Sequence, residues 1–174
     1  MLDFTHLDYL KTGNERQRRA YRCLSDLNIL ENLKDYDPLL TGTIPIEIDL
    51  PESDLDIICY CHNSNEFEAK LNTLYSEYPN YRIHTSTWNN LPSTVAKFST
   101  PDFDIEIFGQ DCPTEKQNAY RHMLKEYEIL KARGELFKAE VIRLKREGMK
   151  TEPAFAHLLG LDGNPYEELL KVEV

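Results

Sequence analysis

Apolar residues recur along the chain at two kinds of spacing, which together predict a mixture of helices and strands. Spacings of three and four residues predict helices over 14–36 and 63–79, with Pro38 and Pro79 at their ends. Asn14 is the expected N-cap of the first helix. Short runs rich in β-branched and aromatic residues predict strands. These runs cover residues 39–42, 54–61, 81–88, 93–100 and 103–109.

Helical spacing dominates the last third of the chain. The pattern predicts a long helix over 114–148, which Gly134 can divide into two. Shorter helices are expected over 151–160 and 164–172, each with a proline near its start. By contrast, residues 44–53 contain two prolines and predict an extended loop between the first two strands.

The order of these elements is helix, two strands, helix, three strands and then helices, which is not the strict alternation of a Rossmann fold. It predicts an α+β fold in which a mixed, twisted β-sheet of about five strands has flanking helices on one side and a helical C-terminal region. We expect one domain over 1–174. Its α/β core, which carries the site, is expected over 1–112, and the helical region over 113–174.

The chain has 174 residues and a formal net charge of -10. A uniformly acidic surface repels polyanions, so binding to duplex DNA is not expected, although a local cationic pocket or a metal could still hold a nucleotide. No apolar run approaches the length of a membrane span, and the N-terminus is acidic where a signal peptide is basic. We therefore expect a cytoplasmic protein without a membrane partner. The sequence does not predict its oligomeric state.

Two pairs of acidic residues interrupt the expected strands, and each pair has one residue between its members. Asp54 and Asp56 begin one strand, and Asp104 and Glu106 lie in another. Side chains two residues apart leave the same face of a strand. The two carboxylates of each pair therefore repel each other in a dry site unless a cation lies between them. Carboxylate oxygens suit Mg²⁺ or Mn²⁺, which also bind phosphate oxygens. The competing interpretation is a solvated strand face, which alternating charges more often indicate.

A Gly-Thr turn at Gly42 and Thr43 precedes the first acidic pair and favours the metal-site interpretation. Glycine has no Cβ, so its backbone can approach a ligand closely. Thr43 supplies an amide and a hydroxyl that can donate hydrogen bonds to a phosphate. The two features together predict that a nucleotide phosphate and a metal bind side by side.

The segment LTGT at 40–43, followed after ten residues by DLDI at 54–57, resembles the signature of the nucleotidyltransferase superfamily, which has a polymerase-beta-like fold. The segment FDIEIF at 103–108 resembles the strand that carries the third acid of that superfamily. With its stretches TGNERQRRAY and QNAYRHM, the whole chain is similar to a small bacterial family of unknown function assigned to this superfamily. Thr43 stands where glycine or serine is usual, which keeps a hydroxyl but stiffens the turn.

This resemblance implies a metal-dependent transfer of a nucleoside monophosphate from an NTP to a hydroxyl acceptor that the sequence does not identify. Asp54, Asp56 and Glu106 would bind Mg²⁺ or Mn²⁺, and these three with Asp104 are the expected catalytic residues. The Gly-Thr turn would hold the β- and γ-phosphates. Glu106 is favoured over Asp104 as third ligand because its side chain is longer and because Gly109 suggests a nearby strand end, where ligands collect.

Other interpretations remain open at this point. No lysine or arginine is marked for the triphosphate, which favours a catalytically inactive nucleotide-binding or regulatory module of the same fold; a nucleotide-sugar glycosyltransferase ranks last. Lys97 and Arg121 are each compatible with a contact in the site and with a solvated surface. Trp88 with Tyr81 could stack a base, but core packing is the expected account of both.

Overall fold

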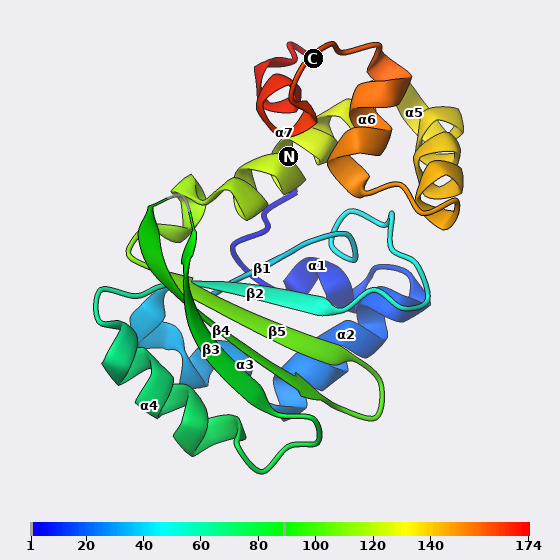
Figure 1. Ribbon diagram of the computed structural model, residues 1–174. Helices are drawn as coiled ribbons and strands as arrows, with labels where there is room; N and C mark the ends of the chain where they lie inside the picture. Colours follow the sequence, from blue (N-terminus) through cyan, green and yellow to red (C-terminus); the bar gives the residue numbers. More distant parts are fainter. Residues whose placement is uncertain (1, 89) are drawn as a thin grey trace.

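A five-stranded mixed β-sheet forms the centre of the computed structural model, which describes residues 2–88 and 90–174 (Figure 1). The strand order is β1-β2-β5-β4-β3. Strands β2 and β5 pair in parallel, and the other neighbours pair antiparallel. The expected α+β fold with a mixed sheet is therefore confirmed. The strands are β1 (Leu39–Thr41), β2 (Leu55–Tyr60), β3 (Arg82–Trp88), β4 (Leu91–Ser99) and β5 (Asp104–Gln110).

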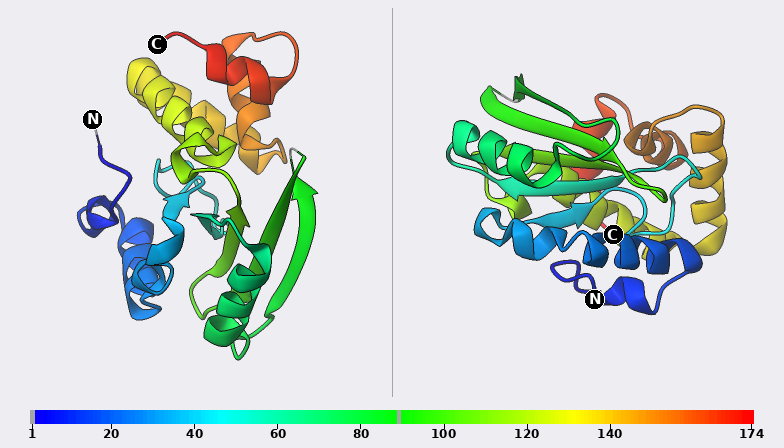
Figure 2. Two further views of the ribbon diagram at one scale, coloured as in Figure 1. Left: turned by 90° about the vertical axis from the view of Figure 1, so that its left-hand side faces the viewer. Right: turned by 90° about the horizontal axis from the view of Figure 1, so that it is seen from below.

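Helices cover the two faces of the sheet unequally (Figures 1 and 2). Helices α2, α3 and α4 pack on one face, whereas α5 and α6 pack against the β1 side of the opposite face. None of the helices in the described part of the chain is both long and apolar enough to cross a membrane. The helices are α1 (Asp8–Lys11), α2 (Glu15–Asp26), α3 (Ile29–Asn32), α4 (Ser64–Tyr75), α5 (Asn118–Arg146), α6 (Thr151–Leu159) and α7 (Pro165–Glu168), with short 3₁₀ turns at Lys34–Tyr36, Thr114–Lys116 and Leu169–Lys171.

Strand β2 shows how the sheet separates its side chains. Leu55, Ile57 and Cys59 are fully buried against the α2–α4 face. Ile58 packs on the opposite face, in a separate hydrophobic core that includes residues of α5 and α6. Because side chains alternate along a strand, Asp56 leaves β2 on the same face as Ile58. The apolar side chains of β2 are therefore buried on both faces of the sheet, and only one of these faces is covered by the helical C-terminal region.

The first predicted helix is shorter than expected. Asn14 caps α2, since its side chain accepts a hydrogen bond from the Gln17 amide, and the Gln17 side chain accepts one from the Asn14 amide in return. The helix does not continue to residue 36 because Asn28 adopts a left-handed conformation with φ of 49°. Gly134, with φ of 78°, introduces the expected break within α5.

Residues 44–53 form a compact series of turns and not the extended loop predicted from their prolines. Ile44, Ile46 and Ile48 are all buried, so the segment is anchored by alternate apolar side chains. Glu47 adopts a positive φ of 60°, which reverses the chain between two of these anchors. The segment connects β1 to β2 and fixes the point at which β2 begins.

Gly109 is the penultimate residue of β5, so the strand ends close to it, as expected, but its missing side chain has a packing role. A Cβ built on Gly109 would lie 2.2 Å from the Phe67 Cε1 atom. Phe67 belongs to α4 and is fully buried. The missing side chain thus lets α4 pack closely on the sheet.

Gly109→Ala should destabilise the protein by about 1–3 kcal/mol, because Phe67 has no free space into which to move. Urea denaturation of the two proteins measures the difference. The Gly109→Ala change should cost less in a Phe67→Leu background, where the ring is absent. Equal costs in both backgrounds would show that the contact with Phe67 is not the cause.

Candidate functional site

A row of polar side chains crosses four strands of the sheet. Thr41 on β1 pairs with Asp56 on β2, Asp56 pairs with Glu106 on β5, and Glu106 pairs with Lys97 on β4. Directly opposite residues on neighbouring strands point to the same face of a sheet. The register therefore places the two carboxylates and the ammonium group next to one another on the face that carries the helical C-terminal region.

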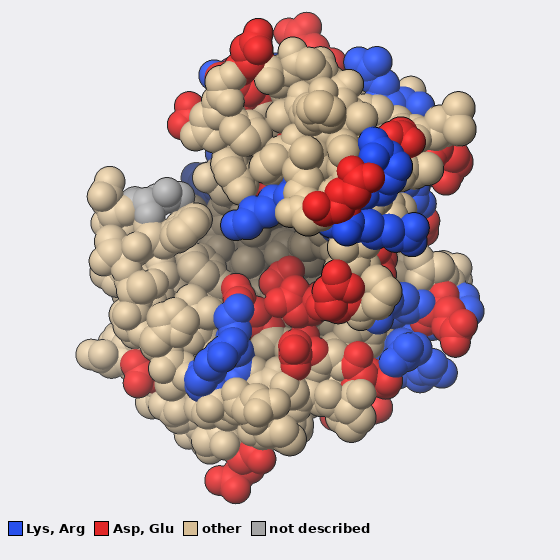
Figure 3. Space-filling view, turned by 45° about the vertical axis from the view of Figure 1, so that its right-hand side comes forward, with Lys and Arg blue, Asp and Glu red and all other residues tan. Residues whose placement is uncertain are grey.

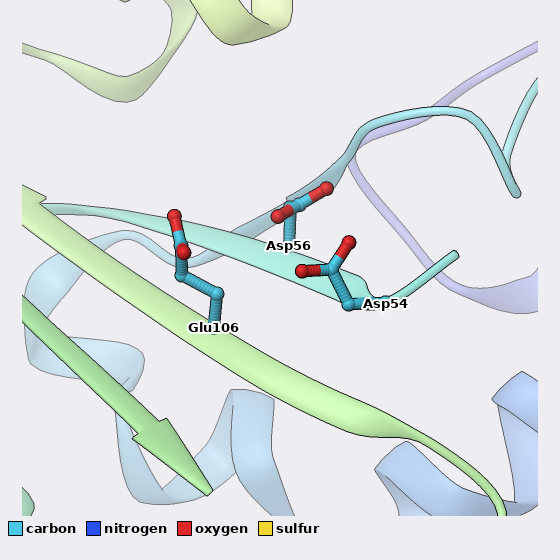
Figure 4. Close-up of side chains that lie close together, drawn as sticks. All are labelled: Asp54, Asp56 and Glu106. Atoms are coloured by element: carbon cyan, nitrogen blue, oxygen red, sulfur yellow. The ribbon is translucent and has the colours of Figure 1, made fainter. Parts of the chain in front are cut away.

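Asp54 completes a group of three carboxylates (Figure 4). It lies immediately before β2, and one oxygen from each of Asp54, Asp56 and Glu106 lies within 4.8 Å of the others. Asp104 lies outside this group: it is exposed, and its carboxylate accepts a hydrogen bond of 2.6 Å from the Ser99 hydroxyl. Of the two acids on β5, Glu106 is the one that converges with the pair at the start of β2.

The three carboxylates repel one another in a partly dry environment. Burial, and to a smaller extent the charges of Asp54 and Glu106, together raise the pKa of Asp56 to about 7. Burial also raises the pKa of Asp54. Lys97 forms an ion pair with Glu106, and this contact raises the pKa of the lysine. One ammonium group faces three acids, so the cluster keeps an excess of negative charge.

A divalent cation fits this donor set. Mg²⁺ and Mn²⁺ prefer oxygen ligands, accept one or two carboxylates directly, and complete their coordination with water or phosphate oxygens. A doubly charged ion would also offset the repulsion that raises the pKa of Asp56. Both the ligand chemistry and the electrostatics of the cluster are therefore suited to a metal.

The position of the Asp56 carboxylate leaves no room for a side chain at residue 42, so only glycine fits there. The φ of Gly42 is +85°, a conformation that residues other than glycine rarely adopt. A Cβ at this position would lie 2.5 Å from the Asp56 Oδ2 atom. The neighbouring Thr43 is tied to the following segment, because its carbonyl accepts a hydrogen bond from the Ile48 amide and its hydroxyl lies 3.4 Å from the Ser53 hydroxyl. The turn therefore packs directly against the acidic cluster.

Arg16 on α2 holds the segment that leads into Asp54. Its guanidinium donates a hydrogen bond of 2.8 Å to the Ser53 carbonyl and forms an ion pair of 3.3 Å with Asp49. It also lies 4.8 Å from the centre of the Phe103 ring, next to β5. Arg16 thus connects the approaches to both acidic strands. Sequence reasoning missed it, because an arginine on the polar side of an amphipathic helix carries no distinguishing signal.

An open cleft of about 1220 Å³ lies between the sheet and the helical C-terminal region. The Gly-Thr turn, Asp56, Lys97 and Glu106 line its sheet wall, and residues of α5, α6 and α7 line the opposite wall. Figure 3 shows acidic side chains gathered within a hollow of the surface and basic side chains at its rims. The converging carboxylates are therefore accessible to a ligand of substantial size.

The remaining candidates have different fates. Lys97 points into the site and pairs with Glu106, so it is not simply a solvated strand residue. Arg121 is an exposed residue of the cleft wall. Trp88 is 61% exposed, so core packing is wrong for it. It lies at the opposite end of β3 from Tyr81, whose hydroxyl donates to Asn72, so the two rings do not form one stacking site.

Several solved structures share this fold. The Cid1 poly(U) polymerase with MgGTP bound matches with a TM-score of 0.55 at 14% identity, over 76% of this chain and 42% of that one. The GLD-2/RNP-8 complex matches with a TM-score of 0.55 at 12% identity, over 87% of this chain and 60% of that one. The polymerase core of TRAMP, an RNA surveillance complex, matches with a TM-score of 0.53 at 14% identity, over 92% of this chain and 50% of that one.

At these identities the likeness concerns the fold, and it confirms the expected nucleotidyltransferase-like architecture. The chain spans 42 to 60% of the length of the three solved chains. No curated protein matches the sequence. The family described as "Domain of unknown function (DUF4269)" matches residues 22–172, which is most of the chain, and the protein therefore belongs to that family.

Proposed function

We propose that the protein is a metal-dependent nucleotidyltransferase, which moves a nucleoside monophosphate from an NTP to a hydroxyl group and releases pyrophosphate. The observation that carries this proposal is the convergence of Asp54, Asp56 and Glu106 within 4.8 Å beside the Gly42 turn, in an open cleft. The likeness of the fold to polymerases supports the same reaction class.

Asp54, Asp56 and Glu106 would hold Mg²⁺ or Mn²⁺, which when bound neutralises triphosphate charge and polarises the reacting phosphate. The backbone of Gly42 and the amide and hydroxyl of Thr43 would bind the β- and γ-phosphates. Both residues line the cleft beside Asp56, so phosphates held there lie next to the acidic cluster. Together, the metal and the phosphate contacts of the turn would orient the α-phosphate toward an acceptor.

In the transfer itself, the acceptor oxygen forms a bond to the α-phosphorus, and the bond from that phosphorus to the bridging oxygen of pyrophosphate breaks. A carboxylate oxygen of Glu106 is the group that we assign to receive the acceptor's proton. Lys97 forms an ion pair with this carboxylate and so holds it in place beside the acceptor position. Arg121, exposed on the cleft wall, can approach the triphosphate from the other side.

A second candidate is a nucleotide-binding module without transfer chemistry. The ion pair between Lys97 and Glu106 favours it, because an ammonium group that occupies a metal ligand competes with the metal. Incubation with α-labelled NTPs, Mg²⁺ and a panel of hydroxyl acceptors separates the two candidates. Transfer of label that is lost in Asp56→Asn excludes the module, whereas NTP binding with no transfer to any acceptor supports it.

Metal-dependent nucleotide binding should require the three converging carboxylates and not Asp104. Asp56→Asn and Glu106→Gln should each weaken the binding of a non-hydrolysable NTP in the presence of Mg²⁺ at least tenfold, about 1.4 kcal/mol. Asp104→Asn is the matched control from the same strand and should stay within about twofold. Isothermal titration calorimetry gives the three affinities. Mg²⁺-independent binding, or an effect confined to Asp104→Asn, would refute the assigned ligand set.

Neutralising Asp56 should stabilise the metal-free protein. Its pKa rises from 3.8 to about 7 on folding, so the folded state retains a proton that the unfolded chain loses, and stability falls as the pH rises between these values. Asp56→Asn removes this loss and should raise the free energy of unfolding by up to about 4 kcal/mol at pH 8, with little change at pH 4. Thermal or urea unfolding in EDTA measures it. Saturating Mg²⁺ should stabilise only the wild type; a variant that is less stable at pH 8 would contradict this account.

Gly42→Ala should abolish Mg²⁺-dependent nucleotide binding, because its Cβ would collide with the Asp56 carboxylate. Gly148→Ala is the control for strain alone, since Gly148 also has a positive φ, of +95°, but has open space around it. Both variants should lose about 1 kcal/mol of stability. Only Gly42→Ala should lose nucleotide affinity in a fluorescence titration, and retained binding by that variant would overturn the role given to the turn.

A further inference from the structure

Glu126 is a buried carboxylate that the proposed reaction does not use. It lies on α5, lines the cleft opposite the acidic cluster, and is only 4% exposed. Among the described residues, none donates a hydrogen bond to its carboxylate or forms an ion pair with it. Burial raises its pKa well above the ordinary range, and the nearby charge of Glu152 acts in the same direction. An unpartnered buried carboxylate is costly, so its retention requires a reason.

The cationic groups near Glu126 are engaged elsewhere. The His122 Nε2 atom lies 2.7 Å from the Tyr166 carbonyl, which makes this nitrogen the donor. Lys145 donates a hydrogen bond of 2.6 Å to the Ile48 carbonyl, and it influences Glu126 only from beyond ion-pair distance. The described part of the protein thus brings no cation into contact with Glu126.

Glu152 extends the acidic character of this wall. It lies on α6, lines the cleft, and places its Oε1 atom 3.7 Å from the His122 Nδ1 atom. The imidazole of His122 therefore faces Glu152 and leaves Glu126 without a partner among the residues that the structure describes. A positively charged ligand group between Glu126 and Glu152 would compensate both acids.

The cleft has room for a second ligand beside a nucleotide. Its volume of about 1220 Å³ exceeds the roughly 300–1,000 Å³ that a site for one small molecule occupies. Its two acidic groups lie on different walls, one built by the sheet and the other by α5 and α6. A metal and triphosphate at the sheet wall leave the helical wall free to bind an acceptor.

We propose that Glu126 and Glu152 bind a protonated amine of the acceptor, so that the molecule modified is a small amino alcohol. The identification of this ligand as the acceptor rests on the proposed function. An RNA acceptor is disfavoured, because a polyanion would meet two further carboxylates in a chain of net charge -10. The exocyclic amine of a nucleobase is neutral and would not stabilise the ionised form of Glu126.

The probe for this subsite is 1,3-diamino-2-propanol, with glycerol as a neutral control that has hydroxyl groups in place of both amines. Titration followed by NMR in the presence of Mg²⁺, without nucleotide, should give a dissociation constant on the order of millimolar for so small a molecule. Glycerol should bind at least tenfold more weakly. Glu126→Gln and Glu152→Gln should each weaken diamine binding at least fivefold.

Glu128→Gln is the matched control, because Glu128 also lies on α5 but pairs with Lys125 and does not line the cleft. It should change diamine affinity by less than about twofold. Equal affinity of wild type and Glu126→Gln overturns the proposal. A loss of diamine affinity in Asp56→Asn alone also overturns it, because the amine then binds at the sheet carboxylates. A third contrary result is a protein that does not bind the diamine and that loses NTP affinity in Glu126→Gln. Diamine binding that depends on Glu126 in a protein that binds no NTP keeps the subsite and removes the proposed transfer.

Discussion

Mutual repulsion among three carboxylates is the constraint on which the rest of the site depends. Such groups separate or take up protons unless rigid elements hold them together. Here the pairing of β2 with β5 places Asp56 and Glu106 opposite each other, and the segment before β2 positions Asp54. Hydrophobic cores on both faces fix the two strands, so the energy that opposes the repulsion comes from apolar packing far from the charges.

The surrounding structure transmits this order to the sheet wall of the cleft. The turns at residues 44–53 are anchored below by buried isoleucines and held at their end by Arg16. From the helical region, Lys138 pairs with Glu47 and Lys145 donates to the Ile48 carbonyl. The same short segment therefore contacts α2 and α5 and leads directly into β2. A change in the packing of the helical region would reach the Gly-Thr turn through it.

The sequence could predict much of this arrangement, because the signals concerned are local. Alternation along a strand puts Asp54 and Asp56 on one face, and a glycine before them indicates a close backbone approach. What local patterns do not contain is register. Glu106 rather than Asp104 joins the cluster because β5 pairs in parallel with β2 at that position, and neither side-chain length nor the presence of Gly109 indicates this register.

Other errors also arise where tertiary context decides. Asn28 breaks a helix whose apolar spacing continues past it, and Trp88 is exposed at the end of β3, which is an edge strand of the sheet. Glu126 did carry a signal that went unused: it lies three residues after Met123 and three before Ile129, on the buried face of α5. A charged residue among apolar positions at helical spacing is costly, and this cost marks it as a candidate for binding.

The parallel pairing of β2 with β5 also has a consequence for how the protein folds. Helix α4 and strands β3 and β4 lie between these two strands in the chain, so Asp56 and Glu106 meet only after the intervening elements have closed a long loop. The three-carboxylate cluster is absent from any shorter folded fragment that stops before β5. A metal ion that requires all three ligands therefore binds the completed sheet and stabilises it by mass action, and it cannot serve as an early template for the fold.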